Sequence, residues 1–279
     1  MRLRLYHHPD GARVAYRETG TGPALALLHS LWLSHREWEP IVEPLAARFR
    51  VVLPDLPLHG DSEDRPRHPY TPGWMAEVLA GFCHEVLGPR PLLAGHDLGA
   101  EVALRALVEG RLRPARLVLM PTRLHRRQPF SPRRSLWRAG CRVGVVPGID
   151  LLLSHAARAV FTPRSGERLS LQRNPAARDL IRHAMADVPG NGNRARSWAK
   201  FARRTPTRAQ RDLLDAYRRI DLPVLLLWAD QDPAHPLQAA REALDLLPDA
   251  QLRVIPATGF LIAYDDPVSV ARELIAFLG

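Results

Sequence analysis

The chain has 279 residues, of which 46% are hydrophobic and 24% charged, and this balance is typical of a globular protein and excludes a disordered or collagen-like chain. Its two cysteines cannot form a disulfide framework, no apolar run approaches the ~18 residues of a membrane span, and the first residues lack the apolar stretch of a signal peptide. We therefore expect a cytoplasmic protein that binds neither a membrane nor, since no aromatic residues alternate with its basic ones, a nucleic acid.

The first 120 residues alternate between strand-like and helix-like segments. Strands are expected at 3–6, 13–18, 24–29, 51–54, 91–95 and 115–120, and helices at 37–48, 74–87 and 97–109. The run Ala24–His29 is continuously apolar, as in a strand that is buried on both faces. This order predicts an α/β fold with a mostly parallel central sheet and helices on both faces.

The alternation stops at residue 121 and resumes after residue 214. Strands at 224–228 and 251–255 and helices at 237–247 and 267–278 complete the pattern, so we expect an α/β core (1–120 and 215–279) interrupted by a helical cap (121–214). The net charge of +10 is concentrated here, because residues 121–220 hold 22 lysines and arginines against 6 acidic residues, a local balance of +16. Such a surface favours an acidic partner. Arginine-biased codon usage is the alternative explanation, since Lys200 is the only lysine.

The sharpest local signal is the stretch Leu92–Ala100, LLAGHDLGA. A buried strand runs into Gly95, the polar Asp97 follows, and Gly99 precedes a helix, which is the strand–turn–helix context of a nucleophile elbow. The glycines permit a turn that is too tight for side chains. The alternative is that Asp97 only caps the helix.

Together with three further segments, this elbow resembles the α/β-hydrolase fold family. His29-Ser30-Leu31 is similar to the segment that supplies an oxyanion-hole amide, residues 55–62 to the family's Asp-x-x-Gly-x-Gly-x-Ser loop, and residues 224–233 to the strand and turn that carry the catalytic acid. The resemblance implies an oxyanion hole formed by the amides of Leu31 and Leu98, and an acid at Asp232. No zinc-like spacing of histidines and no glycine-rich phosphate loop occurs, so neither a metal nor a cofactor is expected.

Asp97 stands where most members of the family have serine, and in this respect the chain resembles epoxide hydrolases and haloalkane dehalogenases. A carboxylate is ionised at neutral pH and needs no base to be nucleophilic, and its attack on a saturated carbon gives a stable alkyl ester. Leu31 and Leu98 occupy the places where dehalogenases hold halide, and no tyrosine lies between 121 and 216 to activate an epoxide, which leaves Tyr217 alone. An oxyanion hole favours carbonyl substrates instead.

The resemblance places a general-base histidine in the segment 256–267, where Phe260 holds its position and no histidine occurs after His235. A general base contributes roughly 10²–10⁴-fold. We therefore expect a hydrolase that is inactive or limited to a single turnover. His235, beside Asp232, is the candidate for a relocated base, whereas His96 is expected to pack inward.

The substrate is expected to be a small apolar molecule in a pocket with hydrophobic walls. The residues expected around Asp97 are Leu31, Trp32, Leu98, Phe260 and Leu261, with His235 at the mouth and Trp137 and Trp198 contributed by the cap. Three alternatives stay open: a lyase or cyclase in which Asp97 acts as an acid or base, a ligand-binding pseudoenzyme, and a serine esterase engineered at positions 97 and 260.

Overall fold

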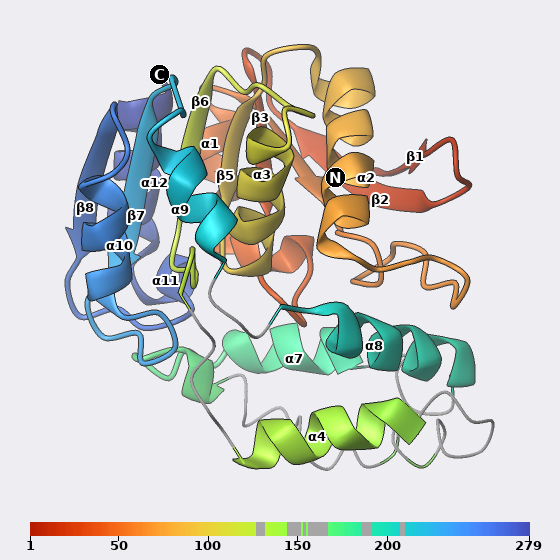
Figure 1. Cartoon of the computed structure of the whole chain (residues 1–279). Coiled ribbons are helices and arrows are strands. Elements are labelled where there is room, and N and C mark those ends of the chain that lie inside the picture. Colours follow the sequence, from red (N-terminus) through yellow and green to blue (C-terminus); the bar gives the residue numbers. More distant parts are fainter. Residues whose placement is uncertain (127–131, 144–151, 153–154, 156–166, 186–190, 207–209) are drawn as a thin grey trace.

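A computed structural model describes residues 1–126, 132–143, 152, 155, 167–185, 191–206 and 210–279 (Figure 1). Eight strands form one sheet: β1 (Leu3–His7), β2 (Arg13–Thr19), β3 (Ala24–Leu28), β4 (Arg50–Pro54), β5 (Leu92–Gly95), β6 (Arg116–Leu119), β7 (Val224–Ala229) and β8 (Ala250–Ile255). Their order is β1-β2-β4-β3-β5-β6-β7-β8. The pairs β1–β2 and β2–β4 are antiparallel and the remaining pairs parallel, which confirms the predicted mostly parallel α/β sheet.

Helices cover both faces of this sheet. The side chains of β3 alternate between the faces, so Leu25 and Leu27 pack in one apolar cluster and Ala26 and Leu28 in the other. The first cluster contains α1 (Glu39–Ala46) and α12 (Pro267–Leu278), and the second contains α2 (Pro72–Phe82), α3 (Leu98–Val108), α9 (Arg211–Tyr217) and α10 (Leu237–Leu244). A strand that is buried on both faces needs a continuous apolar sequence, and β3 has one.

The ends of several elements differ from the sequence-based expectation. The helix expected at 74–87 ends as an α-helix at Phe82 and continues as a π turn, Cys83–Leu87. A short 3₁₀ helix, His35–Trp38, precedes α1, and a four-residue helix α11 (Ile262–Asp265), which was not predicted, precedes α12. Asp266 ends this short helix and caps α12 through the amide of Ser269.

Between β6 and β7 the described residues form helices and no strand. Figure 1 shows α4 (Pro132–Val143), α7 (Ala177–Met185) and α8 (Gly192–Arg204) as a layer below the sheet, and we call these three helices the helical layer. Arg194 of α8 donates a hydrogen bond to the carbonyl of Gly60 at 3.0 Å, and the rings of Trp32 and Trp198 stack with their centroids 3.9 Å apart. The helical layer is thus attached to loops that follow β3 and β4. Among the described helices, none has the length and apolarity that crossing a membrane requires.

Candidate active site

The elbow between β5 and α3 holds Asp97 in a strained backbone conformation. Asp97 has φ 43° and ψ −107°, a region that a residue other than glycine rarely adopts. A Cβ on Gly99 would collide with the carbonyl of Leu28, and one on Gly95 would lie 2.6 Å from the amide of Ala100, so both positions require glycine. The side chain of Asp97 makes no capping hydrogen bond to α3, so the alternative of a simple helix cap does not hold. The turn instead presents the carboxylate to the loops at the carboxyl ends of the strands.

An imidazole from the loop after β7 faces this carboxylate. His235 Nε2 lies 3.2 Å from Asp97 Oδ1, and His235 Nδ1 lies 2.8 Å from Asp232 Oδ2. The His235 side chain is 4% exposed and that of Asp97 14% exposed. The indole N–H of Trp228, at the end of β7, donates to the carbonyl of His235 at 2.8 Å and fixes the backbone of the loop. Asp97, His235 and Asp232 therefore form one continuous hydrogen-bonded row.

The second oxygen of Asp97 contacts one of the two amides that were expected to form an oxyanion hole. The amide of Leu31 donates to Asp97 Oδ2 at 3.1 Å. The amide of Leu98 begins α3 and has no acceptor among the described residues, so it is available to the same region. An amide at a helix N-terminus is a favourable partner for negative charge.

The charges around the row reinforce one another. Burial opposes the ionisation of Asp97, but its hydrogen bond to His235 and the charges of His235, Arg123 and His96 outweigh burial and hold the pKa of Asp97 well below its usual value. Burial alone would lower the pKa of His235, yet hydrogen bonds to Asp232 and Asp97 raise that pKa to about 9. The pKa of Asp232 is lowered, because the contact with His235 outweighs burial. At neutral pH the row is carboxylate, imidazolium, carboxylate.

Two further aromatic rings extend from His235, since Phe260 stacks on it and His96 in turn contacts Phe260. Phe260 stacks on His235 with centroids 5.8 Å apart and planes 28° apart, and His96 meets Phe260 at 4.7 Å. His96 contacts the buried carboxylate of Glu37 through Nδ1, while Glu37 also accepts the amide and hydroxyl of Ser30 at 2.6 and 2.9 Å. The inward packing expected of His96 is therefore found, and Glu37 is its partner.

A pocket next to the elbow extends along α3. The side chains of Leu98, Glu101, Val102 and Arg105 form one stripe of that helix because they recur at three- and four-residue intervals. The rest of the lining comes from Tyr70, Pro72, Met75, Phe201, Thr205, Pro206 and Gln210. Glu101 is paired with the guanidinium of Arg123 through two hydrogen bonds of 2.9 Å. With this carboxylate neutralised, most of the remaining wall is apolar.

The structure separates the predicted site residues into those near Asp97 and those elsewhere. Leu31, Asp232 and His235 contact Asp97 or its row, and Leu98 and Phe260 lie beside it, whereas Leu261 is buried in a separate cluster with Leu33, Ala177, Leu180 and Tyr264. The expectation that Leu261 borders Asp97 therefore lacks a contact. Trp32 and Trp198 stack on each other, while the side chain of Trp137 lies outside the described residues. Tyr217 is buried beside His125.

Phe260 occupies the position where a general-base histidine was expected, but Asp97 still has an imidazole beside it, which belongs to His235, the candidate for a relocated base. The path of the loop after β7 turns His235 back toward the elbow, three residues after the acid. This spacing, Asp232-Pro233-Ala234-His235, was the only sequence signal for the arrangement. Reasoning from the sequence also missed Glu37, Glu101 and Arg123, whose roles depend on contacts between distant segments.

One group of the described residues has the side chains of a cation site. His35, Asp55 and Asp61 bring their ligand atoms within 4.8 Å of one another. The guanidinium of Arg17 lies 2.6 Å from Asp61 and 3.7 Å from Asp55 and already supplies the positive charge there. The group is a partly buried ion-pair network that fixes the loop after β4.

Comparison with known proteins identifies the family. The model of the alpha/beta hydrolase family matches residues 25–273, so the chain belongs to this family. It is 28% identical over 263 residues to a pimeloyl-[acyl-carrier protein] methyl ester esterase of Nitrosomonas europaea, covering 89% of this chain and 92% of that one.

Solved structures agree with this assignment. A thermophilic esterase from Thermogutta terrifontis superimposes with a TM-score of 0.76 at 26% identity, covering 100% of this chain and 98% of that one. The epoxide hydrolase CorEH superimposes with a TM-score of 0.78 at 18% identity, covering 99% of each chain, which shows a shared fold. The chain is thus a hydrolase-family protein with an aspartate at its elbow.

Proposed function

We propose that this protein hydrolyses a small apolar substrate through a covalent ester on Asp97, with His235 as the general base and Asp232 as the acid that orients it. The observation that carries the proposal is that the two carboxylate oxygens of Asp97 have different partners. One carboxylate oxygen contacts His235 and the other accepts the amide of Leu31. A nucleophile held in this way has its attacking oxygen, Oδ1, beside the base and its second oxygen, Oδ2, at an amide of the expected oxyanion hole.

In the first step, Asp97 Oδ1 attacks a saturated carbon of the substrate. A bond forms between that oxygen and the carbon, and the bond to the leaving group breaks with its electron pair. If the leaving atom is an oxygen, it takes up the proton that the His235 imidazolium gives up. If it is a halide, it leaves as the anion and the imidazolium proton passes to solvent water. The lowered pKa of Asp97 keeps the carboxylate ionised and ready to attack.

In the second step, neutral His235 removes a proton from water, and the hydroxide attacks the carbonyl carbon of the Asp97 ester. Negative charge develops on Oδ2, where the Leu31 amide already lies and the Leu98 amide is available. Collapse releases the alkoxide, which takes the proton from His235, and leaves Asp97 as a carboxylic acid. The proton of that acid then passes to His235, which restores the carboxylate and the imidazolium. Esterification removes one of the two negative charges that raise the pKa of His235, so the pKa falls in the intermediate and His235 more readily takes the neutral form that the second step needs.

Because Asp97 itself occupies one amide of the expected oxyanion hole, the site favours attack on a saturated carbon over attack on a substrate carbonyl. The Leu31 amide is already bonded to the carboxylate, so a substrate carbonyl would have to compete with Asp97 for it. The apolar stripe along α3 supports a hydrophobic substrate, since burying each CH₂ contributes about 0.8 kcal/mol. Relatives that are named esterases act on acyl esters, so an ester belongs in the test panel.

Intact-mass spectrometry of the wild type, H235Q and D97N tests the proposal. Each protein is incubated with a terminal epoxide, an alkyl bromide and an acetate ester that share one alkyl chain. We expect the wild type to turn over at least one substrate without a lasting adduct, H235Q to accumulate an adduct at Asp97, and D97N to do neither. Glutamine is the matched choice because it retains polarity and size but cannot take up the proton.

Two outcomes would contradict the proposal. Turnover that persists in D97N would remove the nucleophile from the mechanism. A permanent adduct on the wild type would show that His235 does not serve as a base.

A further inference from the structure

Both nitrogens at the edge of the His235 ring are occupied. Nδ1 is held by Asp232 at 2.8 Å and Nε2 faces Asp97 at 3.2 Å. Together with the covalent bond from Cβ, these contacts define the ring plane and leave the faces of the ring to packing neighbours.

Phe260 is one such neighbour. Its ring is stacked on His235 with centroids 5.8 Å apart and planes 28° apart. The Phe260 backbone is held on both sides, because the amide of Gly259 donates to Asp265 Oδ2 at 2.8 Å and the amide of Leu261 donates to the carbonyl of Leu169 at 3.1 Å. The backbone on either side of the phenyl ring is thus fixed by Leu169 and by Asp265 of α11, and neither contact involves His235.

A phenyl face also favours one protonation state of its neighbour. The face of an aromatic ring carries partial negative charge, so it attracts an imidazolium more strongly than a neutral imidazole. An aliphatic side chain of similar volume would fill the space without this electrostatic preference. The contact therefore links the orientation of His235 to its charge.

We propose that Phe260 is a positioning residue, which packs against the His235 ring, keeps it in this orientation and stabilises its protonated form, in the place where the family resemblance puts the base itself. The proposal rests on the proposed function of His235 as the base. It gives a role in the reaction to Phe260, which stands where the family resemblance places a histidine. The phenyl ring supports a base that is supplied from the loop after β7.

Other charged groups face His235 and are common to all variants of position 260. Asp232 lies on its own loop, Asp97 belongs to the elbow, His96 lies at the end of β5 with its ring 6.4 Å away, and Glu101 comes from α3. Arg123, from the segment after β6, acts on the same row through Asp97 and Glu101. A change at Phe260 that moves the titration of His235 while these groups remain has to act through the ring contact.

The test compares F260L, F260M and F260Y with the wild type, using F277L as a matched control on α12. The His235 titration is followed by NMR, and kcat and KM are measured against pH with the substrate found above. We expect F260L and F260M to lose roughly three- to tenfold in kcat, with little change in KM, and to titrate His235 at lower pH. F260Y retains the ring and should resemble the wild type, as should F277L.

The two readouts separate failure of this proposal from failure of the proposed function. An unchanged His235 titration in F260L and F260M, in proteins that remain folded, would overturn the positioning role whether or not a substrate is known. If F260L and F260M titrate His235 at lower pH but the wild type turns over no substrate, the ring contact stands and the hydrolytic function is contradicted. Equal losses in F260L and F260Y would also overturn the proposal, because both ring-bearing and ringless variants would then behave alike.

Discussion

At Asp97 the backbone and the side chain are held for different reasons. The left-handed backbone conformation costs on the order of 1–3 kcal/mol, and it persists because β5, α3 and the two glycines leave the chain no other path. The side chain is fixed by Leu31 on one oxygen and His235 on the other. Strain and charge are thus concentrated at one residue, as expected of a nucleophile rather than a structural aspartate.

The raised pKa of His235 predicts how stability depends on pH. The pKa is about 9 in the folded protein against 6.5 for the free group, so its contribution is fully present below pH 6.5 and is lost as the pH rises through 9. We expect the free energy of unfolding to fall by at most about 3 kcal/mol over this range. Urea denaturation at several pH values measures it, and H235Q is the control that should lack this slope. An equal slope in both proteins would show that other groups cause it.

The contact between α3 and the segment after β6 depends on a largely buried ion pair. Burial raises the pKa of Glu101, and Arg123 opposes this through its charge and two hydrogen bonds. We expect R123M to lose about 3–5 kcal/mol of stability, because it leaves a buried carboxyl group unpaired, and R123M/E101L to recover most of that loss. Chemical denaturation measures both. If the double variant is no more stable than R123M, packing of the arginine stem outweighs the ion pair.

The loops after β7 and β8 bring positions 235 and 260 into contact, and this predicts that the base can be exchanged between them. H235F should trap the Asp97 ester, and H235F/F260H, which exchanges the two rings, should hydrolyse it at least about tenfold faster, since a general base contributes roughly 10²–10⁴-fold. The decay of the adduct is followed by intact-mass spectrometry. F260H alone, which keeps His235, is the control for placing a histidine at this position. An adduct of equal lifetime in H235F and H235F/F260H would show that the loop after β8 cannot direct an imidazole to the ester.

The same loops mark where prediction from the sequence succeeded and where it failed. The strands were predictable because each is a short apolar run between turn residues, and Asp97 and Leu31 were predictable because the elbow and the oxyanion segment directly adjoin strands. The contact between His235 and Asp97 was not, because it depends on how the chain turns after Asp232, and the hydrogen bond from Trp228 that fixes this turn is a tertiary contact. The direction of Leu261 failed for a similar reason, since its partners belong to α7.

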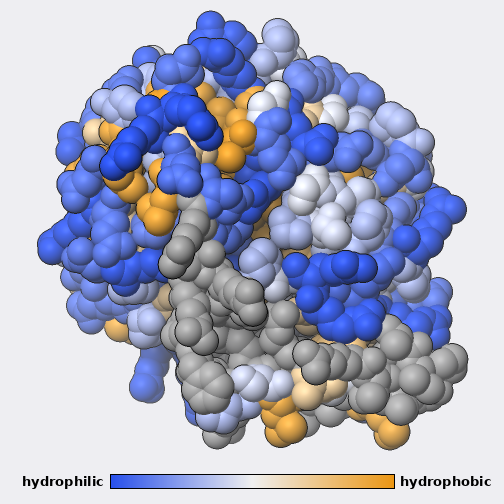
Figure 2. All heavy atoms as spheres, viewed as in Figure 1, coloured by the Kyte–Doolittle hydropathy of each residue, from blue (hydrophilic) through white to orange (hydrophobic). Residues whose placement is uncertain are grey.

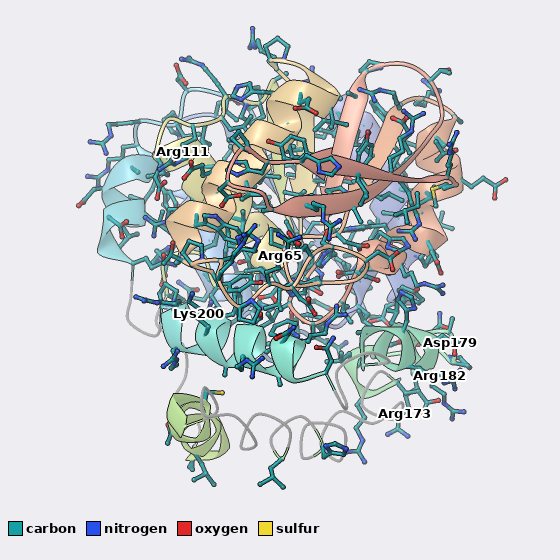
Figure 3. All side chains as sticks on the ribbon, turned by 90° about the vertical axis from the view of Figure 1, so that its right-hand side faces the viewer. Arg65, Arg111, Arg173, Asp179, Arg182 and Lys200 are labelled. Carbon is teal, nitrogen blue, oxygen red and sulfur yellow. The ribbon has the colours of Figure 1, made fainter. Side chains whose placement is uncertain are left out.

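Across the whole molecule, positive charge is concentrated in the sequence segment that includes the helical layer. Residues 121–220, which include the helical layer, carry a balance of +16, and the remainder carries −6. The face seen in Figure 2 is mostly hydrophilic, with scattered apolar side chains. Figure 3 places Arg173 and Arg182 on the helical layer and Arg111 on the opposite side of the core. A field with this polarity attracts anions toward the carboxyl ends of the strands, where Asp97 lies.

This distribution of charge predicts a preference for negatively charged substrates, which added salt should abolish. For a substrate that bears a carboxylate remote from the reacting carbon, we expect kcat/KM to fall as NaCl rises from about 0.01 M to about 1 M, because the screening length shortens from about 30 Å to about 3 Å. A neutral substrate of the same length should show no such fall. R173E/R182E should flatten the salt dependence by weakening the field at the helical layer. R90E/R111E is the control, because it makes the same change in net charge near the amino ends of β5 and β6, and it should leave the salt dependence steep. Equal effects of the two pairs would show that the total charge of the protein, and not the placement of charge over the site, controls the encounter with substrate.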